Sequence, residues 1–170
     1  DVVLVGLAPS KGKLTRPASG QIQQLFGKRR QGQVLWKGIV VNSSEGSPVR
    51  AVYDGKVLYA DWLKGFGLVT IVDHGEGYMT VYGRNQALLK QPGDSVLQGE
   101  TIGLVGSSGG QMSSGLYFEI RHKGKALDPK SWLNNRFISL LPPSTTITMS
   151  IKLASRLPIS VFVCDFIIFF

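Results

Sequence analysis

Few side chains in this sequence could hold a metal ion. The 170 residues include two histidines, His74 and His122, and a single cysteine, Cys164. A hydrolytic zinc site needs three convergent protein ligands and one open position for water. His74 follows Asp73 in a predicted turn, where adjacent strand residues would point to opposite faces, and His122 ends a strand beside a basic turn. The residues therefore predict no zinc site, a structural role for His74 and a solvated His122.

The serines and glycines at 107–110 do not form a nucleophile motif. Their sequence, Ser-Ser-Gly-Gly, lacks the Gly-x-Ser-x-Gly pattern of a nucleophile elbow. It also lacks the Gly-Lys-Ser/Thr element of a phosphate-binding loop. We expect these glycines to shape a turn between strands. A single cysteine allows neither an intrachain disulfide nor a thiolate metal cluster.

The formal net charge of the chain is +8, from 19 Lys and Arg against 11 Asp and Glu. Such an excess suits an acidic partner protein, an anionic envelope polymer or nucleic acid, and it also serves solubility. No basic cluster is flanked by aromatic residues that could stack on bases, which argues against nucleic acid. Residues 1–3 contain no basic segment of a signal peptide, so any targeting segment is expected upstream of this sequence.

Short apolar runs separated by Gly, Asp and Asn predict an all-β, mainly antiparallel domain. The pair Asp54-Gly55 is typical of a hairpin turn between two of these runs. We expect residues 1–20 to form an N-terminal loop or linker and residues 21–133 to form the folded domain. The expected strands are 34–41, 48–53, 56–61, 67–73, 78–82, 94–97, 101–105, 116–122 and 126–127, followed by a short turn from residue 128.

The tail, residues 134–170, departs from this pattern. Residues 134–156 are rich in Ser and Thr, and the last 14 residues, 157–170, are nearly all apolar. A helix needs about 20 apolar residues to span a bilayer, so this stretch is short for that purpose. We interpret the tail as a non-native extension, with a truncated membrane anchor or an additional packed strand as the alternatives.

Four groups of segments within residues 34–133 resemble the LytM, or lysostaphin-like, metallopeptidase domain. The resemblance implies its fold, a duplicated-hybrid-motif β-sheet domain with short helical turns. The order and spacing of the segments agree throughout. They are 36–40 with 45–49, 54–57 with 65–67, 72–75 with 82–84, and 99–103 with 106–109 and 116–120.

Active members of that family bind zinc through a His-x-x-x-Asp pair and the second histidine of a His-x-His motif. The first histidine of that motif, and another after Tyr-Gly, assist the zinc-bound water, whose pKa the metal lowers. In this sequence Trp36 and Val40 take the places of the first pair, Gly115 and Tyr117 those of the His-x-His, and Arg84 that of the last histidine. The resemblance thus implies a degenerate domain with no metal, cofactor or catalysis.

Segments 60–69, 105–111 and 127–133 narrow the resemblance to EnvC-like murein hydrolase activators of the Gram-negative periplasm. The resemblance implies an upstream coiled coil, absent here, that connects to the division machinery. It also implies a partner, a zinc-dependent N-acetylmuramyl-L-alanine amidase whose autoinhibition the domain relieves during septal wall splitting. A passive peptidoglycan-binding module is the alternative, and an active zinc endopeptidase is a more distant one.

The vacated metal site is expected to form a groove for the amidase. Aromatic, aliphatic and cationic residues of this kind are enriched in interface hot spots, and Lys37 and Arg121 could pair with acidic residues of the partner. Alternatively, Val40, Val69 and Phe66 are core residues and the two cations are solvated. The expected lining is Trp36, Lys37, Val40, Phe66, Val69, Tyr82, Arg84, Tyr117 and Arg121.

Overall fold

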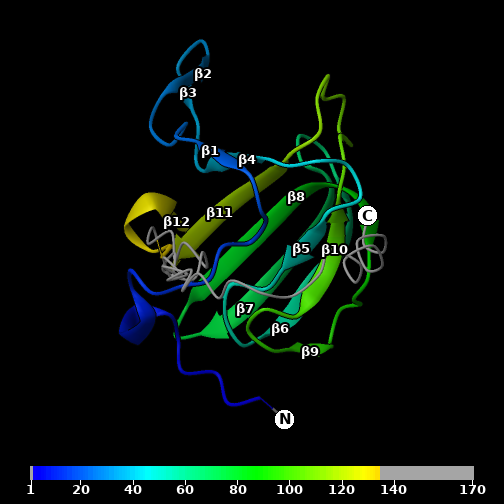
Figure 1. Ribbon diagram of the computed structural model, residues 1–170. Helices are drawn as coiled ribbons and strands as arrows, with labels where there is room; N and C mark the ends of the chain where they lie inside the picture. The colour runs from blue at the N-terminus through cyan, green and yellow to red at the C-terminus, as the bar shows by residue number, and fades with distance from the viewer. Residues whose placement is uncertain (1, 135–170) are drawn as a thin grey trace, which may run out of the picture. The chain divides into compact units, whose positions relative to one another are not determined.

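The structure is a computed structural model that describes residues 2–134 (Figure 1). The expected all-β, mainly antiparallel fold is confirmed. The two short 3-10 helices are η1 (Ala8–Ser10) and η2 (Pro129–Ser131). The strands are β1 (Gln21–Gln23), β2 (Arg29–Gln31), β3 (Val34–Leu35), β4 (Ile39–Asn42), β5 (Pro48–Arg50), β6 (Gly55–Leu63), β7 (Gly67–Gly75), β8 (Tyr78–Leu88), β9 (Ser95–Val96), β10 (Thr101–Val105), β11 (Leu116–His122) and β12 (Lys125–Leu127).

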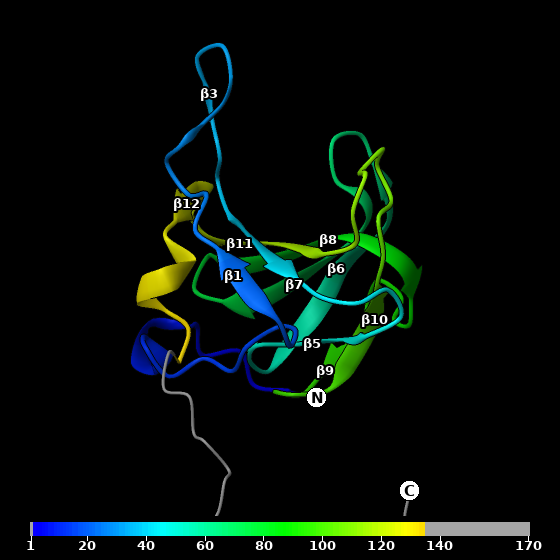
Figure 2. The ribbon, with the colours of Figure 1, turned by 45° about the horizontal axis from the view of Figure 1, so that its top comes forward.

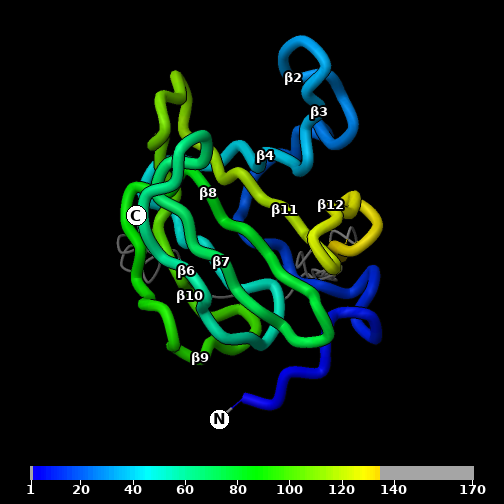
Figure 3. Tube along the Cα trace, turned by 180° about the vertical axis from the view of Figure 1, so that it is seen from behind, coloured from blue at the N-terminus to red at the C-terminus, as the bar shows by residue number. Residues whose placement is uncertain are grey.

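Ten of these strands form one sheet with the order β1-β4-β11-β8-β7-β6-β9. Strand β10 pairs with β5 and β8, and β12 pairs with the outer end of β11. The long central strands β11, β8, β7 and β6 run side by side in the view from behind (Figure 3). Strands β2 and β3 pair only with each other and form a separate hairpin that projects from the sheet (Figure 1).

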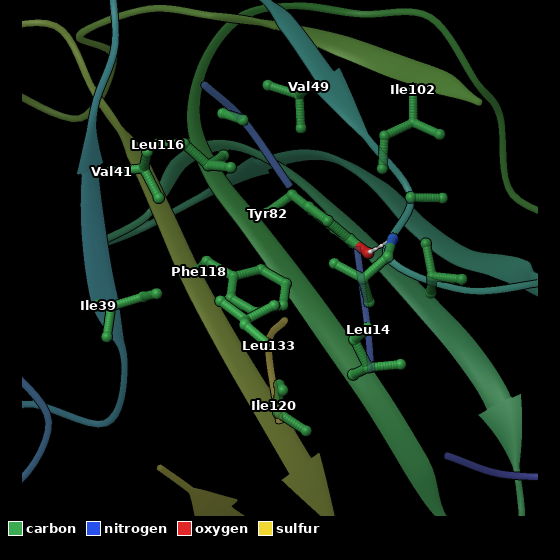
Figure 4. Close-up of a cluster of buried hydrophobic side chains, with 14 of the residues drawn as sticks. Leu14, Ile39, Val41, Val49, Tyr82, Ile102, Leu116, Phe118, Ile120 and Leu133 are labelled. Atoms are coloured by element: carbon green, nitrogen blue, oxygen red, sulfur yellow. Dashed lines mark hydrogen bonds between the residues drawn. The ribbon is translucent and has the colours of Figure 1, made fainter. Parts of the chain in front are cut away.

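One face of the sheet carries the hydrophobic core. Successive strand residues point to opposite faces, and the core takes Ile39 and Val41 from β4 together with Leu116, Phe118 and Ile120 from β11 (Figure 4). The same alternation therefore directs the residues between them to the second face of the sheet.

The predicted hairpin at Asp54-Gly55 is wrong. Strand β5 pairs with β10, whereas β6 pairs with β7 and β9. The Asp54 carboxylate accepts a hydrogen bond from the Gln98 N–H at 2.7 Å, which ties this turn to the β9–β10 connection. The turn therefore connects two strands that do not pair with each other. An Asp-Gly sequence occurs in turns of both kinds, so it does not by itself predict a hairpin.

The predicted domain boundary at residue 21 is also too late. Leu7, Leu14 and Ala18 are buried members of the core, in the segment expected to be a loop or linker. Leu14 forms a parallel bridge with Leu133 near the other end of the domain. In residues 2–134 no helix is long and apolar enough to cross a membrane. The prediction for the tail concerns residues that, apart from Asn134, lie outside this described part.

His74 is a buried structural residue, as its place in a turn suggested. Its Nδ1 lies 2.7 Å from the Asp54 carbonyl oxygen, and its Nε2 lies 2.7 Å from Oγ1 of Thr80. Burial lowers the pKa of the imidazole, and the backbone hydrogen bond to Asp54 only partly opposes this. By contrast, His122 is half-buried and stacks on Tyr78 with ring centroids 4.0 Å apart, so it is partly exposed to solvent.

Acid is therefore expected to destabilise the domain through His74. The unfolded chain binds a proton near pH 6.5 while the folded ring stays neutral, so stability is complete above that pH and falls as the pH drops towards the lower folded pKa. The decline should approach at most about 1.4 kcal/mol per pH unit. Urea unfolding of the wild type and His74→Gln at pH 7.5 and 5.5 checks this, because only the wild type should lose stability through this group. An equal decline in both proteins would contradict it.

Candidate functional site

The second face of the sheet carries buried side chains that do not belong to the main core. Tyr117 and Glu119 lie on this face, since their neighbours Leu116 and Phe118 are core residues. Tyr117 is in register with Val40 of β4 on one side and with Gly83 of β8 on the other. Strands β4, β11 and β8 thus bring together positions that are far apart in the sequence.

Three aromatic side chains, Trp36, Phe66 and Tyr117, form what we call the aromatic cluster. The Tyr117 ring centroid lies 5.9 Å from that of Trp36 and 5.7 Å from that of Phe66, both in tilted arrangements. Such geometry is favourable between aromatic quadrupoles. Trp36 precedes β4, and Phe66 lies in the β6–β7 turn, which the Arg84 N–H holds by donating to the Phe66 carbonyl at 2.7 Å.

Glu119 is a carboxylate beneath this cluster with only 1% of its side chain exposed. The Tyr117 hydroxyl donates to its Oε1 at 2.6 Å, and Nε of Arg121 donates to its Oε2 at 2.6 Å. Burial, together with the charge of Glu119, raises the pKa of the Tyr117 hydroxyl, so this tyrosine is a neutral donor. Sequence reasoning missed Glu119, although its spacing from Tyr117 and Arg121 places all three on one face.

Two further cations adjoin the cluster. The Arg84 guanidinium lies 5.9 Å from the ring centroid of Trp36 and 5.6 Å from that of Tyr117, and the Arg30 guanidinium lies 4.4 Å from Trp36. These distances are typical of cation–π contacts. Arg84 adopts φ +67° and is 9% exposed. Arg30 was not anticipated, because nothing in its polar strand β2 marks it as a neighbour of Trp36.

The β6–β7 turn and the loop after β10 are fastened to each other. Oγ of Ser108 accepts from the Leu68 N–H at 3.0 Å and donates to the Asn85 carbonyl at 2.6 Å. Gly67 has φ +71°, and a Cβ there would lie 2.4 Å from Oγ of Ser108. The serine-glycine segment thus has the turn-shaping role expected of it. Both loops and the β2–β3 hairpin project on the same side of the sheet (Figure 2).

The structure brings most of the predicted lining residues together but not all of them. Tyr82 faces the opposite way: it is buried in the main core, where its hydroxyl accepts from the Val52 N–H at 3.0 Å (Figure 4). Tyr82 is in register with Phe118 of β11, and both side chains point to the core face of the sheet. Val69 is completely buried and presents no surface. Lys37 is exposed beside Trp36. The others gather around Tyr117 through the contacts given above.

The five positions that would hold and assist zinc in the resemblance do converge. Tyr117 pairs with Val40, Arg84 lies 5.6 Å from the Tyr117 ring, and a Cβ on Gly115 would lie 3.2 Å from Cγ1 of Val40. Their chemistry does not fit the metal, because indole and guanidinium nitrogens are donors only and Val and Gly have no ligand atom. Within residues 2–134 no group of three or more His, Cys, Asp or Glu could hold a metal ion.

Comparison with known proteins identifies the family of this domain. The model of peptidase family M23 matches residues 34–129. The chain belongs to peptidase family M23. This M23 domain is also similar to solved M23 structures, among them a putative peptidase M23 of Pseudomonas aeruginosa with a TM-score of 0.63 and 21% identity, covering 75% of this chain and 51% of that one. At that identity the likeness concerns the fold.

Two curated relatives of this M23 domain are named as activators. The murein hydrolase activator EnvC of Escherichia coli K12 is 48% identical over 128 residues, which cover 75% of this chain and 30% of the relative. The murein hydrolase activator NlpD of the same strain is 36% identical over 121 residues, which cover 71% of this chain and 31% of the relative. The chain therefore spans less than a third of the length of either.

Proposed function

We propose that this M23 domain is a non-catalytic activator of a periplasmic peptidoglycan hydrolase, an N-acetylmuramyl-L-alanine amidase that splits the septal wall during cell division. The observation that carries the proposal is the aromatic cluster. Two of its members, Trp36 and Tyr117, take the places of zinc ligands in the family resemblance, and the neighbouring Arg84 takes that of an assisting histidine. The names of the relatives, murein hydrolase activators, support the same role.

The loops around the cluster strengthen the case for a protein partner. Large apolar side chains on strand β3, at the end of β6 and in the loop after β10 are exposed, although burial of apolar surface is favourable. With the neighbouring cations they have the composition of a protein interface. They are Val34, Leu35, Trp62, Leu63 and Met112, with exposed fractions of 57%, 50%, 54%, 37% and 105%.

Activation by binding requires a difference in affinity between two forms of the hydrolase. If the domain binds the open form more tightly than the autoinhibited form, it shifts the population towards the open form by that ratio. A segment that blocks the hydrolase active site in the closed form could dock on the aromatic cluster in the open form. The domain itself then needs no reactive group.

Trp36→Ala is the test of this surface. Trp36 is half-buried, contacts Tyr117 and lies outside the regular strands, so its loss should leave the fold intact. Truncating an aromatic hot spot typically costs about 2 kcal/mol or more, equivalent to about 30-fold weaker binding. The full chain is titrated into a purified amidase, and both binding and release of dye-labelled peptidoglycan are measured. Stimulation should need about 30-fold more of the variant.

Leu97→Ala is the matched control, because Leu97 is 57% exposed and lies in the β9–β10 connection. It should stimulate like the wild type. If Trp36→Ala stimulates the amidase as well as the wild type does, the aromatic cluster is not the surface that binds the amidase. If the wild type is retained on isolated sacculi but stimulates no amidase, the passive peptidoglycan-binding alternative replaces the activator.

A further inference from the structure

Arg84 is a largely buried residue whose guanidinium has no counter-ion in the described structure. Only 9% of the residue is exposed, and its guanidinium lies within about 6 Å of the ring centroids of both Trp36 (5.9 Å) and Tyr117 (5.6 Å). Lys90 pairs with Glu100 and Arg121 pairs with Glu119, and in the described part of the chain no ion pair involves Arg84. Its side chain also has no hydrogen bond in that part of the chain. A buried charge is normally paired, because its desolvation is otherwise costly.

A second guanidinium makes this arrangement still less favourable. Arg30 lies over the same indole at 4.4 Å. Burial lowers the pKa of Arg84, and the positive charge of Arg30 lowers it further. Glu119 cannot relieve the repulsion, because its two oxygens already accept from Tyr117 and Arg121. Among residues 2–134 the site therefore has two guanidinium charges, and its one carboxylate, Glu119, is already paired.

We infer that Arg30 and Arg84, held against Trp36 and Tyr117, form a receptor for one carboxylate of the bound hydrolase, an Asp or Glu side chain. This inference rests on the proposed function and names the chemistry of its partner. The planar fork of a guanidinium matches a carboxylate through two parallel hydrogen bonds. The rings of Trp36 and Tyr117 lie within cation–π distance of these guanidinium groups, and the partner brings the missing negative charge.

The receptor predicts that Arg84→Gln weakens binding to the hydrolase without lowering the stability of the free chain. The unfolding midpoint of the free chain should stay the same or rise, since an uncompensated charge is removed. Binding to the hydrolase should fall at least tenfold, because the carboxylate would lose its charged partner. Arg84→Lys should recover only part of that loss, as an ammonium has no planar fork. A merely structural arginine would lower stability and binding together.

The experiment has two readouts on the full chain. In the first, sodium acetate is titrated at constant ionic strength while the Nε–H resonances of the arginines are followed by NMR. Arg84 and Arg30 should shift saturably, Arg121 should not, and the shift of Arg30 should be lost in Arg84→Gln. In the second, hydrolase affinity is compared among the wild type, Arg84→Gln, Arg84→Lys and the control Arg50→Gln, an equal loss of charge on β5.

The outcomes separate this inference from the proposed function. Unchanged hydrolase affinity in Arg84→Gln, with no acetate response at Arg84, would overturn the receptor and leave the activator standing. An acetate response in a wild-type chain that binds no hydrolase would support the receptor and overturn the activator. Retention on sacculi that depends on Arg84 and needs no hydrolase would overturn the proposed occupant, because the carboxylate would then belong to peptidoglycan.

Discussion

Glu119→Ala should lower the free energy of unfolding by about 3 kcal/mol, the low end of the range for breaking a buried ion pair. The carboxylate is 1% exposed and accepts from both Tyr117 and Arg121. Its removal leaves a buried hydroxyl without an acceptor and a guanidinium, 28% exposed, without its partner. Partial solvent access to Arg121 keeps the loss near this lower value. Urea unfolding followed by far-UV circular dichroism measures the change.

Two comparisons make the result specific to the buried site. Glu119→Gln retains an amide oxygen as an acceptor, so it should lose less stability than Glu119→Ala. Glu100→Ala breaks the ion pair with Lys90 near the surface and should cost at most about 1 kcal/mol. If Glu119→Ala costs no more than Glu100→Ala, the Tyr117–Glu119–Arg121 network does not stabilise the fold.

Gly38→Ala should have an effect of similar size for a steric reason. A Cβ at position 38 would lie 2.2 Å from the carbonyl oxygen of Phe118 and 2.8 Å from Cγ of Glu119. The first of these atoms belongs to the backbone of β11, so it cannot move aside without disturbing the β4–β11 pairing. We expect a loss of about 3 kcal/mol, the upper part of the range for overpacking, together with displacement of Trp36 from Tyr117.

The measurement combines the unfolding midpoint with the near-UV circular dichroism of the aromatic side chains. Lys37→Ala is the control, because Lys37 is the exposed neighbour of Gly38 and its truncation should stay within about 0.5 kcal/mol. An unchanged midpoint and near-UV spectrum in Gly38→Ala would show that β4 can move away from β11 without cost.

The sequence alone predicted the positions of the strands well, but it predicted less well which face of the sheet each side chain points to. The expected strands 101–105 and 116–122 have the bounds of β10 and β11. Strand alternation says that Tyr117 and Phe118 point to opposite faces, but only register decides which face is the core. Tyr82 was therefore assigned to the wrong face, since its environment depends on pairing with Phe118 of β11.

Charged residues of the site were the hardest to foresee. Glu119 reads as an ordinary exposed residue, and its burial makes sense only beside Tyr117 and Arg121. Arg30 lies in a three-residue polar strand whose pairing with β3 is its only ladder. Its contact with Trp36 follows from the path of that hairpin, and no local pattern encodes it.

The link made by Ser108 has a consequence for the entropy of association. It fastens the β6–β7 turn to the loop after β10, so these two segments have little freedom to lose when a partner arrives. The β2–β3 hairpin has no ladder to the main sheet, so fewer backbone contacts fix its position. Phe66 therefore lies on a segment that is held before a partner arrives, whereas Arg30 lies on one held by fewer backbone contacts, so most of the ordering cost of association should fall on the hairpin.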